Sequence, residues 1–246
     1  MAHFLTYVIG EDPDTQLAVY DKNLPVDAHR YFPPPRQIER MCAVHGVELA
    51  RQLLPHTQDW YPGLTAGMDE AGRLYVVSDE NPYAKWDWWI MGGRWHGYLL
   101  LRGSVVGKAG VIGTFNTEPM HGDRSADQCR IGDIDWAGMR VELALQAQDD
   151  WRDFLVDQQE YGDQATFWHG VVEGWSEEDF IAHRSHPAPF ALVMDTDWFS
   201  RDDIGWWGVS LDADDPGEWE RQFDKLIGSL PEETLITVAD CHLGPT

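Results

Sequence analysis

Two stretches at opposite ends of the chain contain residue types that can move protons or bind a metal ion. His3 lies in the first apolar run, and Asp240, Cys241 and His242 end the last one. Two imidazoles and a carboxylate could ligate Zn²⁺ or Fe²⁺, and a thiol beside an imidazole could act as a nucleophile with its base. These chemistries require the two stretches to meet, which we expect because the terminal strands of α+β domains are often neighbours in the sheet.

Alternation along a strand divides these candidates between two faces. Cys241 would face away from Asp240 and His242, so one face offers a carboxylate and an imidazole and the other only the thiol. The alternative is an ordinary strand end, at which the polar groups cap loops and Cys241 is simply buried. The candidate catalytic residues are His3, Asp240, Cys241 and His242, of which His3, Asp240 and His242 are also candidate ligands for a divalent metal cofactor.

Residues 83–98 concentrate four of the 13 tryptophans around a Gly-Gly-Arg turn. Indole is bulky and its N–H needs a partner, so this density predicts a pocket wall or a shaped surface rather than an ordinary core. Unobstructed amides at Gly92 and Gly93, the guanidinium of Arg94 and the indole faces together suit an anionic group attached to a flat ring, such as a nucleotide. The alternative is a tight turn in which Arg94 pairs with a carboxylate such as Asp87, while the tryptophans fill the core.

A second tryptophan pair lies between glycines at residues 205–208. In a hairpin these two indoles would lie on opposite faces of the sheet, and one of them could join the same wall. The candidate ligand-binding residues are Lys85, Trp86, Trp88, Trp89, Gly92, Gly93, Arg94, Trp95, His96, Trp206 and Trp207. His183 and His186, which precede Pro187, are expected to be solvated in a loop.

The composition restricts the class of protein and its partners. With 246 residues, of which 43% are hydrophobic, the chain can form a substantial core. Its net charge of −24 repels phosphate backbones, which excludes general nucleic-acid binding. Positive charge resides mainly on arginine, the better residue for planar bidentate recognition of anions, so a local anion site inside an acidic shell is compatible with this charge.

Cysteine usage and the N-terminus indicate where the protein resides. The three cysteines are far apart, and none has a partner at the short spacing of a metal site. The N-terminus lacks a basic region, and no apolar run approaches the roughly 18 residues that a membrane span requires. We therefore expect a reduced, cytoplasmic protein with no membrane interaction.

Hydrophobic periodicity predicts helices and strands without regular alternation. The predicted helices cover residues 14–22, 38–53, 136–155 (capped by Asp133 or Asp135) and 216–230 (capped by Asp215). The predicted strands cover residues 3–9, 166–172, 190–194 and 234–239, with hairpins at 64–78 and at 98–106 across Gly103. This pattern indicates a single α+β domain over residues 1–246, with a largely antiparallel sheet, packed helices, and loop insertions near 23–36 and 107–132.

Several of these motifs resemble a family of uncharacterised proteins encoded by bacteriophages and actinobacteria. The shared stretches are His3-Phe4 with residues 8–10, Lys85 to Trp89 through Gly92-Gly93-Arg94-Trp95, residues 133–140, Gly205 to Gly208, and the terminal residues 234–242. The resemblance implies a phage-linked or actinobacterial origin, and no activity is implied by it. The prolines at 33–35 and the region 110–130 do not match the family.

Two functions from different classes fit these observations. In the first, the protein binds, and by acid–base or metal chemistry converts, a small anionic aromatic ligand such as a nucleotide, which in a phage would suit counter-defence. In the second, it is an acidic interaction protein or nucleic-acid mimic that binds a host protein without catalysis. A tryptophan-rich interface of a structural accessory protein is a third alternative.

Overall fold

The computed structural model describes residues 2–32, 65–71, 73–113, 118–172, 174–201 and 217–243. The chain forms two compact units, one built from residues 1–17 and 86–246 and the other from residues 18–85. The single-domain organisation of the sequence analysis stays a prediction. The predicted helix at 38–53, the prolines at 33–35 and the 205–208 motif lie outside the described residues.

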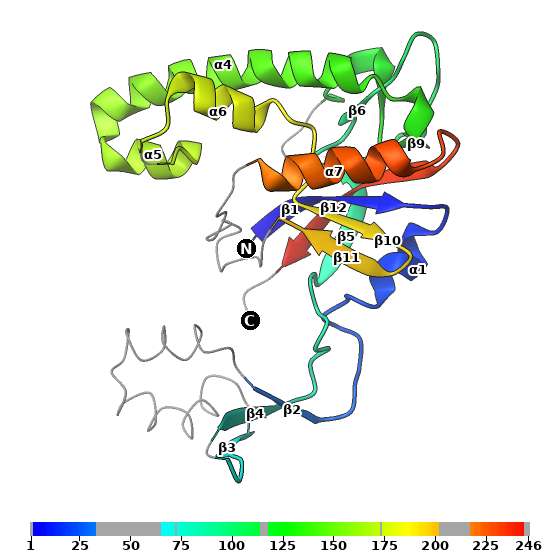
Figure 1. The fold of residues 1–246 in the computed structure, drawn as a ribbon, viewed down its shortest axis with the longest axis vertical. Coiled ribbons are helices and arrows are strands. Elements are labelled where there is room, and N and C mark those ends of the chain that lie inside the picture. Colours follow the sequence, from blue (N-terminus) through cyan, green and yellow to red (C-terminus); the bar gives the residue numbers. More distant parts are fainter. Residues whose placement is uncertain are drawn as a thin grey trace. The chain divides into compact units, whose positions relative to one another are not determined.

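The larger unit is built on a mixed sheet of seven strands (Figure 1). Six strands follow the order β11-β10-β1-β12-β5-β7, and β9 also pairs with β12. The strands are β1 (Ala2–Ile9), β5 (Trp88–Gly93), β7 (Val111–Ile112), β9 (Gln128–Arg130), β10 (Ala191–Met194), β11 (Asp197–Ser200) and β12 (Leu235–Leu243). Only the β1–β10 and β5–β7 pairs of this sheet are parallel, so the predicted α+β class with a largely antiparallel sheet is confirmed.

The two terminal strands are neighbours at the centre of this sheet. β1 and β12 pair along their whole length, and β5 pairs with the C-terminal half of β12. Both terminal strands are almost entirely buried. The expectation that the chain's two ends meet in the sheet is therefore confirmed.

Helix α7 (Glu218–Ser229) crosses one face of the sheet, and the first half of α4 (Trp136–Tyr161) lies beyond it (Figure 1). Phe223 of α7 packs against Tyr7 of β1, with ring centroids 5.9 Å apart. Met139 of α4 and Val238 of β12 belong to the same buried core. Helix α1 (Pro13–Ala18) follows β1 and buries Leu17.

The far half of α4 forms a helical arm with α5 (Asp163–His169) and α6 (Glu177–Arg184) (Figure 1). This arm has its own apolar cluster, in which Phe180 of α6 packs against Trp151 of α4 with ring centroids 5.3 Å apart. Asp135 caps α4 as predicted, because its side chain accepts a hydrogen bond from the Gly138 N–H. Within the described residues, no helix combines the length and apolarity needed to cross a bilayer.

Two predicted strands are wrong. Residues 166–172 fall in α5 and the loop after it, since Gly162 and the left-handed Gly170 bound a helix there. Residues 104–106 form no strand, and Val106 is 89% exposed. The buried β6 (Leu99–Leu100) pairs instead with β8 (Ser125–Ala126), so a distant partner replaces the local hairpin.

The remaining elements are short. The predicted insertion at 107–132 contains β7, β8, β9 and the 3₁₀ helices η2 (Gly122–Arg124) and η3 (Ile131–Asp133). In the smaller unit, the order β2 (His29–Tyr31), β4 (Leu74–Ser78), β3 (Thr65–Met68) forms a three-stranded sheet. The predicted 64–78 hairpin is confirmed by the antiparallel β3–β4 pair.

Candidate functional site

Three aromatic side chains meet where the ends of β1, β12 and β5 lie side by side. His3 lies opposite His242, which in turn lies opposite Trp88. The two imidazole rings form an edge contact with centroids 4.8 Å apart, and Trp88 stacks on His242 at 5.2 Å. Trp88 is 42% exposed, so this cluster opens to solvent on its indole side.

Each imidazole in this cluster is held by its own carboxylate. Nδ1 of His3 lies 2.8 Å from Oδ1 of Asp240, and Nδ1 of His242 lies 2.6 Å from Oδ1 of Asp87. A carboxylate only accepts, so both Nδ1 atoms donate and the neutral rings carry their lone pair on Nε2. Within the described residues neither Nε2 has a hydrogen-bond partner. We name His3, His242, Asp240, Asp87 and Trp88 the paired-histidine site.

The backbone around the site fixes both carboxylates. The Arg94 N–H donates to Oδ2 of Asp240 (2.9 Å), so this buried carboxylate, 2% exposed, is bonded through both oxygens. The N–H of Asp87 donates to the carbonyl of His242 (2.9 Å), which ties the end of β12 to the segment that precedes β5. These bonds limit the rotation of both imidazoles.

Gly92 and Gly93 act through their lack of a side chain. Their φ values are +83° and +57°, a region that favours glycine. A Cβ on Gly93 would overlap the Asp240 side chain, and one on Gly92 would lie 2.9 Å from Oδ2 of Asp127. Because the next amide, that of Arg94, already binds Asp240, this turn holds a protein carboxylate at a place where the sequence predicted a ligand's anionic group.

His96 belongs to a different and fully buried pair. Its Nδ1 lies 2.7 Å from Oδ2 of Asp127. The same oxygen accepts from the Gly110 N–H (2.6 Å), and Oδ1 of Asp127 accepts from the Gly97 N–H (2.7 Å). Asp127 has no exposed surface, so this network is structural and joins three loops. Sequence reasoning missed Asp127, because nothing in its neighbourhood distinguishes it from other loop aspartates.

The tryptophans of residues 83–98 do not form one wall. Trp86 is buried, and its Nε1 donates to the carbonyl of Leu17 (3.2 Å). Trp89 lies opposite Cys241 and therefore on the other face from Trp88. Trp95 packs against the main core. Of these four residues only Trp88 lies at the paired histidines, which contradicts the predicted shared lining.

Lys85 belongs to the smaller unit, where its backbone N–H donates to the carbonyl of Tyr20 (2.9 Å). Trp206 and Trp207 lie outside the described residues.

Cys241 is fully buried on the face opposite His3 and Asp240. Burial raises the pKa of its thiol to about 12, so the thiolate is absent at neutral pH. A protonated thiol on the face of the sheet opposite His3 cannot form the nucleophile–base pair with His3 that the sequence allowed. Within the described part of the chain, no group of three or more His, Cys, Asp or Glu side chains is arranged to hold a metal ion.

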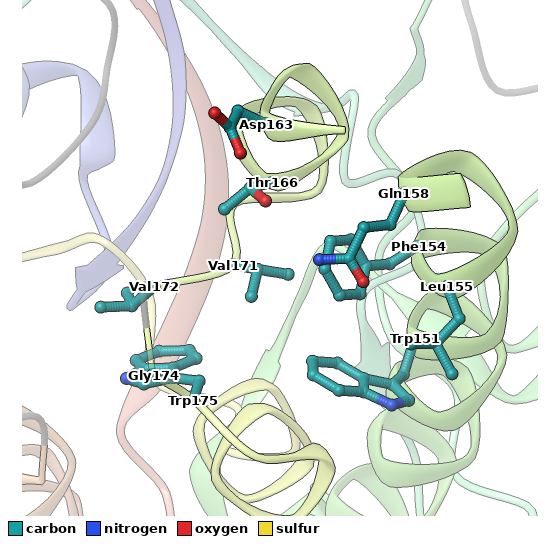
Figure 2. A pocket seen from close by; sticks show the side chains of 10 residues that line it. All are labelled: Trp151, Phe154, Leu155, Gln158, Asp163, Thr166, Val171, Val172, Gly174 and Trp175. Carbon is teal, nitrogen blue, oxygen red and sulfur yellow. The ribbon is translucent and has the colours of Figure 1, made fainter. Parts of the chain in front are cut away.

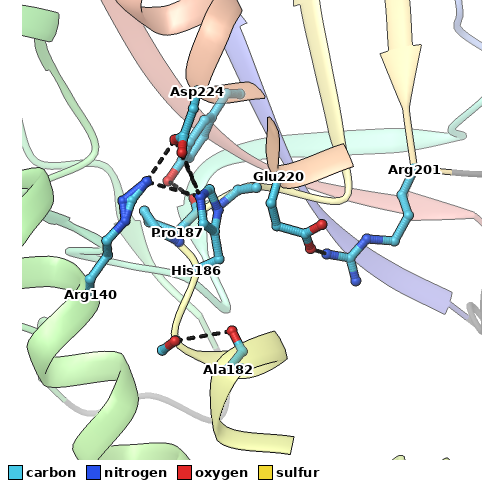
Figure 3. Close-up of polar contacts among 10 residues, drawn as sticks. Arg140, Ala182, His186, Pro187, Arg201, Glu220 and Asp224 are labelled. Carbon is cyan, nitrogen blue, oxygen red and sulfur yellow. Dashed lines mark hydrogen bonds and ion pairs between the residues drawn. The ribbon is translucent and has the colours of Figure 1, made fainter. Parts of the chain in front are cut away.

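A second group of polar side chains lies where α6 and α7 approach each other (Figure 3). Arg140 and His186 both contact Asp224, with N–O distances of 2.6 and 3.2 Å. Nearby, Arg201 pairs with Glu220. His183 and His186 are therefore not solvated in a loop as predicted. His183 lies on α6, and His186, just after that helix, packs against Phe223 of α7.

Two hollows adjoin the helical arm. One, of about 570 Å³, lies between α4, α5 and residues 171–175, where Trp151, Phe154 and Trp175 give it apolar walls (Figure 2). The other, of about 500 Å³, is lined by Trp175, Asp179, Ala182, His183, His186, Gly217 and Glu220.

Comparisons with family models, with curated proteins and with solved structures give no match for this chain. The resemblance to the phage and actinobacterial family therefore stays a prediction.

Proposed function

We propose that the paired-histidine site binds a small anionic aromatic ligand, such as a nucleotide, and transfers protons during its conversion. The observation that carries this proposal is the pair of imidazoles, each held through Nδ1 by its own carboxylate, beside a partly exposed indole. A protein that needed these residues only for stability would gain little from two adjacent imidazoles in this arrangement.

The chemistry follows from the two Nε2 atoms. A neutral imidazole held through Nδ1–H accepts a proton at Nε2, and a protonated one donates from the same atom. One ring would remove the proton of an attacking hydroxyl or water, and the other would protonate the leaving oxygen, so that the two rings exchange protonation states in one cycle. Group transfer to or from a phosphate ester has these requirements.

Trp88 and Arg94 supply the affinity in this proposal. The exposed part of the indole offers a stacking surface for a flat ring, worth about 1–3 kcal/mol per base in comparable sites. Arg94 is exposed and its backbone N–H is bonded to Asp240, so its positive charge lies near the site and would attract the anionic group.

Binding is tested first. Nucleoside mono- and diphosphates are titrated into the full-length protein by calorimetry, and Trp88→Ala is compared with Trp168→Ala, a second exposed tryptophan that lies on α5. We expect Trp88→Ala to weaken binding about tenfold or more and Trp168→Ala to leave it unchanged. Equal affinity in both variants, or no binding by the wild type, would refute the proposal.

Conversion is tested with the ligand that binds. His3→Gln and His242→Gln should retain binding but lower turnover about 10²–10⁴-fold, because each removes a proton-transfer group. His121→Gln is the matched control, since His121 also contacts a carboxylate, that of Glu142, outside the site. Turnover that survives in both site variants would show that the imidazoles do not transfer protons.

The second candidate is the acidic interaction protein, which the net charge of −24 favours. Long-range attraction to a basic partner weakens with added salt, whereas stacking at Trp88 persists. A host protein whose capture is lost between about 0.1 and 0.5 M salt, and is unaffected by Trp88→Ala, would favour this candidate.

A further inference from the structure

The hollow between α6 and α7 shares no residue with the paired-histidine site. Its volume is about 500 Å³, and its lining combines the indole of Trp175 with the polar side chains of His183, His186 and Glu220. Two of these lining side chains, His183 and Glu220, determine which hydrogen bonds a ligand in the hollow could make.

His183 lines this hollow, and its contact with Arg201 fixes the tautomer of its ring. Nη1 of Arg201 lies 3.0 Å from its Nε2. A guanidinium only donates, so Nε2 accepts and the proton of the neutral ring resides on Nδ1. Burial and the neighbouring charge of Arg201 lower the pKa of His183 to about 4, so the ring is neutral at pH 7.

Glu220 lies beside this ring in the lining of the hollow. One carboxylate oxygen, Oε1, pairs with Nη2 of Arg201 and lies 4.0 Å from Nδ1 of His183. The residue is 9% exposed and lies in the first turn of α7. Oε2 of Glu220 and Nδ1 of His183 are both buried, and neither has a hydrogen-bond partner among the described residues.

Two buried and unsatisfied polar atoms side by side are rare in proteins, because each loses its hydrogen bonds to water without replacement. His183 and Glu220 both line the hollow, so a small rotation of each side chain would let a bound ligand with the complementary pair satisfy this donor and this acceptor together. The charged side chains of the lining restrict the class of ligand further. The Arg201 guanidinium is already paired with Glu220, and Asp179 is an exposed carboxylate bonded to Ser176. The lining is therefore unsuited to a phosphate or a carboxylate.

We propose that this hollow binds a neutral planar group in which an N–H lies beside an acceptor, as on the edge of adenine or in the carboxamide of nicotinamide. The ligand's acceptor takes the His183 Nδ1–H, and its N–H donates to Oε2 of Glu220. Trp175, which contacts the His183 ring edge-on with centroids 5.0 Å apart, provides the apolar wall. This site is independent of the function proposed for the paired histidines.

The first test changes only the ligand. 9-Methyladenine and its N6,N6-dimethyl analogue, which carry no N–H at position 9, are titrated into the full-length wild-type protein, and so are nicotinamide and N,N-dimethylnicotinamide. We expect 9-methyladenine or nicotinamide to bind, and its dimethyl analogue, which lacks the donor, to bind at least about tenfold more weakly. Whichever of the two pairs of compounds binds identifies the source of the ligand. No binding of either pair at millimolar concentration, or equal binding of both members of a pair, overturns the proposal.

The second test locates the site. Glu220→Gln replaces the acceptor with an amide, and Glu218→Gln makes the same change at an exposed position two residues away. Only Glu220→Gln should weaken binding, again about tenfold or more. The nitrogen resonances of His183 should show the Nδ1–H tautomer and shift on binding, and Trp88→Ala should have no effect. Binding that is retained in Glu220→Gln, or that leaves His183 unshifted, would place the ligand elsewhere and overturn the proposal.

Discussion

At the residue scale, Gly93 is where the geometry of the paired-histidine site is most sensitive to a single atom. It adopts a φ of +57°, and a Cβ there would overlap the side chain of Asp240, which holds His3. Gly93→Ala should therefore lower the free energy of unfolding by about 3 kcal/mol, the sum of left-handed strain and overpacking. Urea denaturation measures this change, and the same variant should lose the His3–Asp240 contact.

Gly103 provides the matched control for Gly93. Its φ is +56°, but a Cβ on it would meet nothing within 4 Å. Gly103→Ala should therefore show the strain alone, about 1 kcal/mol. If the two alanine variants were equally stable, the close approach between Gly93 and Asp240 would have no energetic weight.

A second prediction at this scale concerns His183 and acid. Its pKa falls from 6.5 to about 4 on folding, so below pH 6.5 the unfolded state binds a proton that the native state excludes. Stability is therefore lost as the pH falls from about 6.5 to 4, by up to about 3 kcal/mol, and His183 adds no pH dependence above that window. The difference between wild type and His183→Gln in urea unfolding at several pH values isolates this contribution. A constant difference from pH 7 to 4 would contradict it.

The sequence could predict part of the candidate site and could not predict the rest. His3 and His242 were expected to meet, because terminal strands commonly pair. The partner of His242, Asp87, was named only for Arg94, since its position depends on the pairing of β5 with β12, which no local pattern encodes. The His183–Glu220 pair joins residues on α6 and α7 whose packing is a tertiary property, so periodicity carried no signal for it.

At the element scale, the start of helix α4 depends on one side chain, that of Asp135. The Asp135 carboxylate accepts from the Gly138 N–H at 2.9 Å, which satisfies one of the four donors that a helix start leaves open. Asp135→Ala should cost about 1 kcal/mol of stability, whereas Asp153→Ala, an exposed position within the same helix, should cost less than about 0.5 kcal/mol. Thermal unfolding followed by circular dichroism measures both. A loss in Asp153→Ala as large as that in Asp135→Ala would show that the cap has no special role.

Elements with strong periodicity were predictable, as α4, α7, β1 and β12 show. The start of α7 was not, because its N-cap is Gly217, which makes no side-chain cap bond, and not the predicted Asp215. The strand predicted at 166–172 failed because Thr, Phe and Trp favour strands by packing on a sheet, and here no sheet is adjacent. Ala165 instead packs against the arm's own cluster, and two glycines bound the helix. The hairpin at 98–106 failed for a related reason, since Leu99 and Leu100 gain more by burial beside β8 than by pairing with an exposed neighbour.

At the scale of the larger unit, two separate apolar clusters stabilise different parts of the fold. The main cluster joins α7 and the first half of α4 to the sheet, and the second joins the far half of α4 to α5 and α6. The two hollows adjoin the second cluster, and Trp175 lines both of them. Because the buried residues form two separate clusters, we expect the arm to open locally while the sheet stays folded.

Phe180→Ala tests this division. Phe180 has no exposed surface and lies in the arm's cluster, so its truncation should destabilise the arm by about 3–5 kcal/mol. Hydrogen exchange should accelerate in α5, α6 and the far half of α4, while the amides of β1 and β12 stay protected. Phe167→Ala, in an exposed position on α5, is the matched control and should change neither region. If Phe180→Ala accelerated exchange in β1 and β12 as much as in α6, the arm and the sheet would unfold together, and the ligand site between α6 and α7 would depend on the stability of the whole unit.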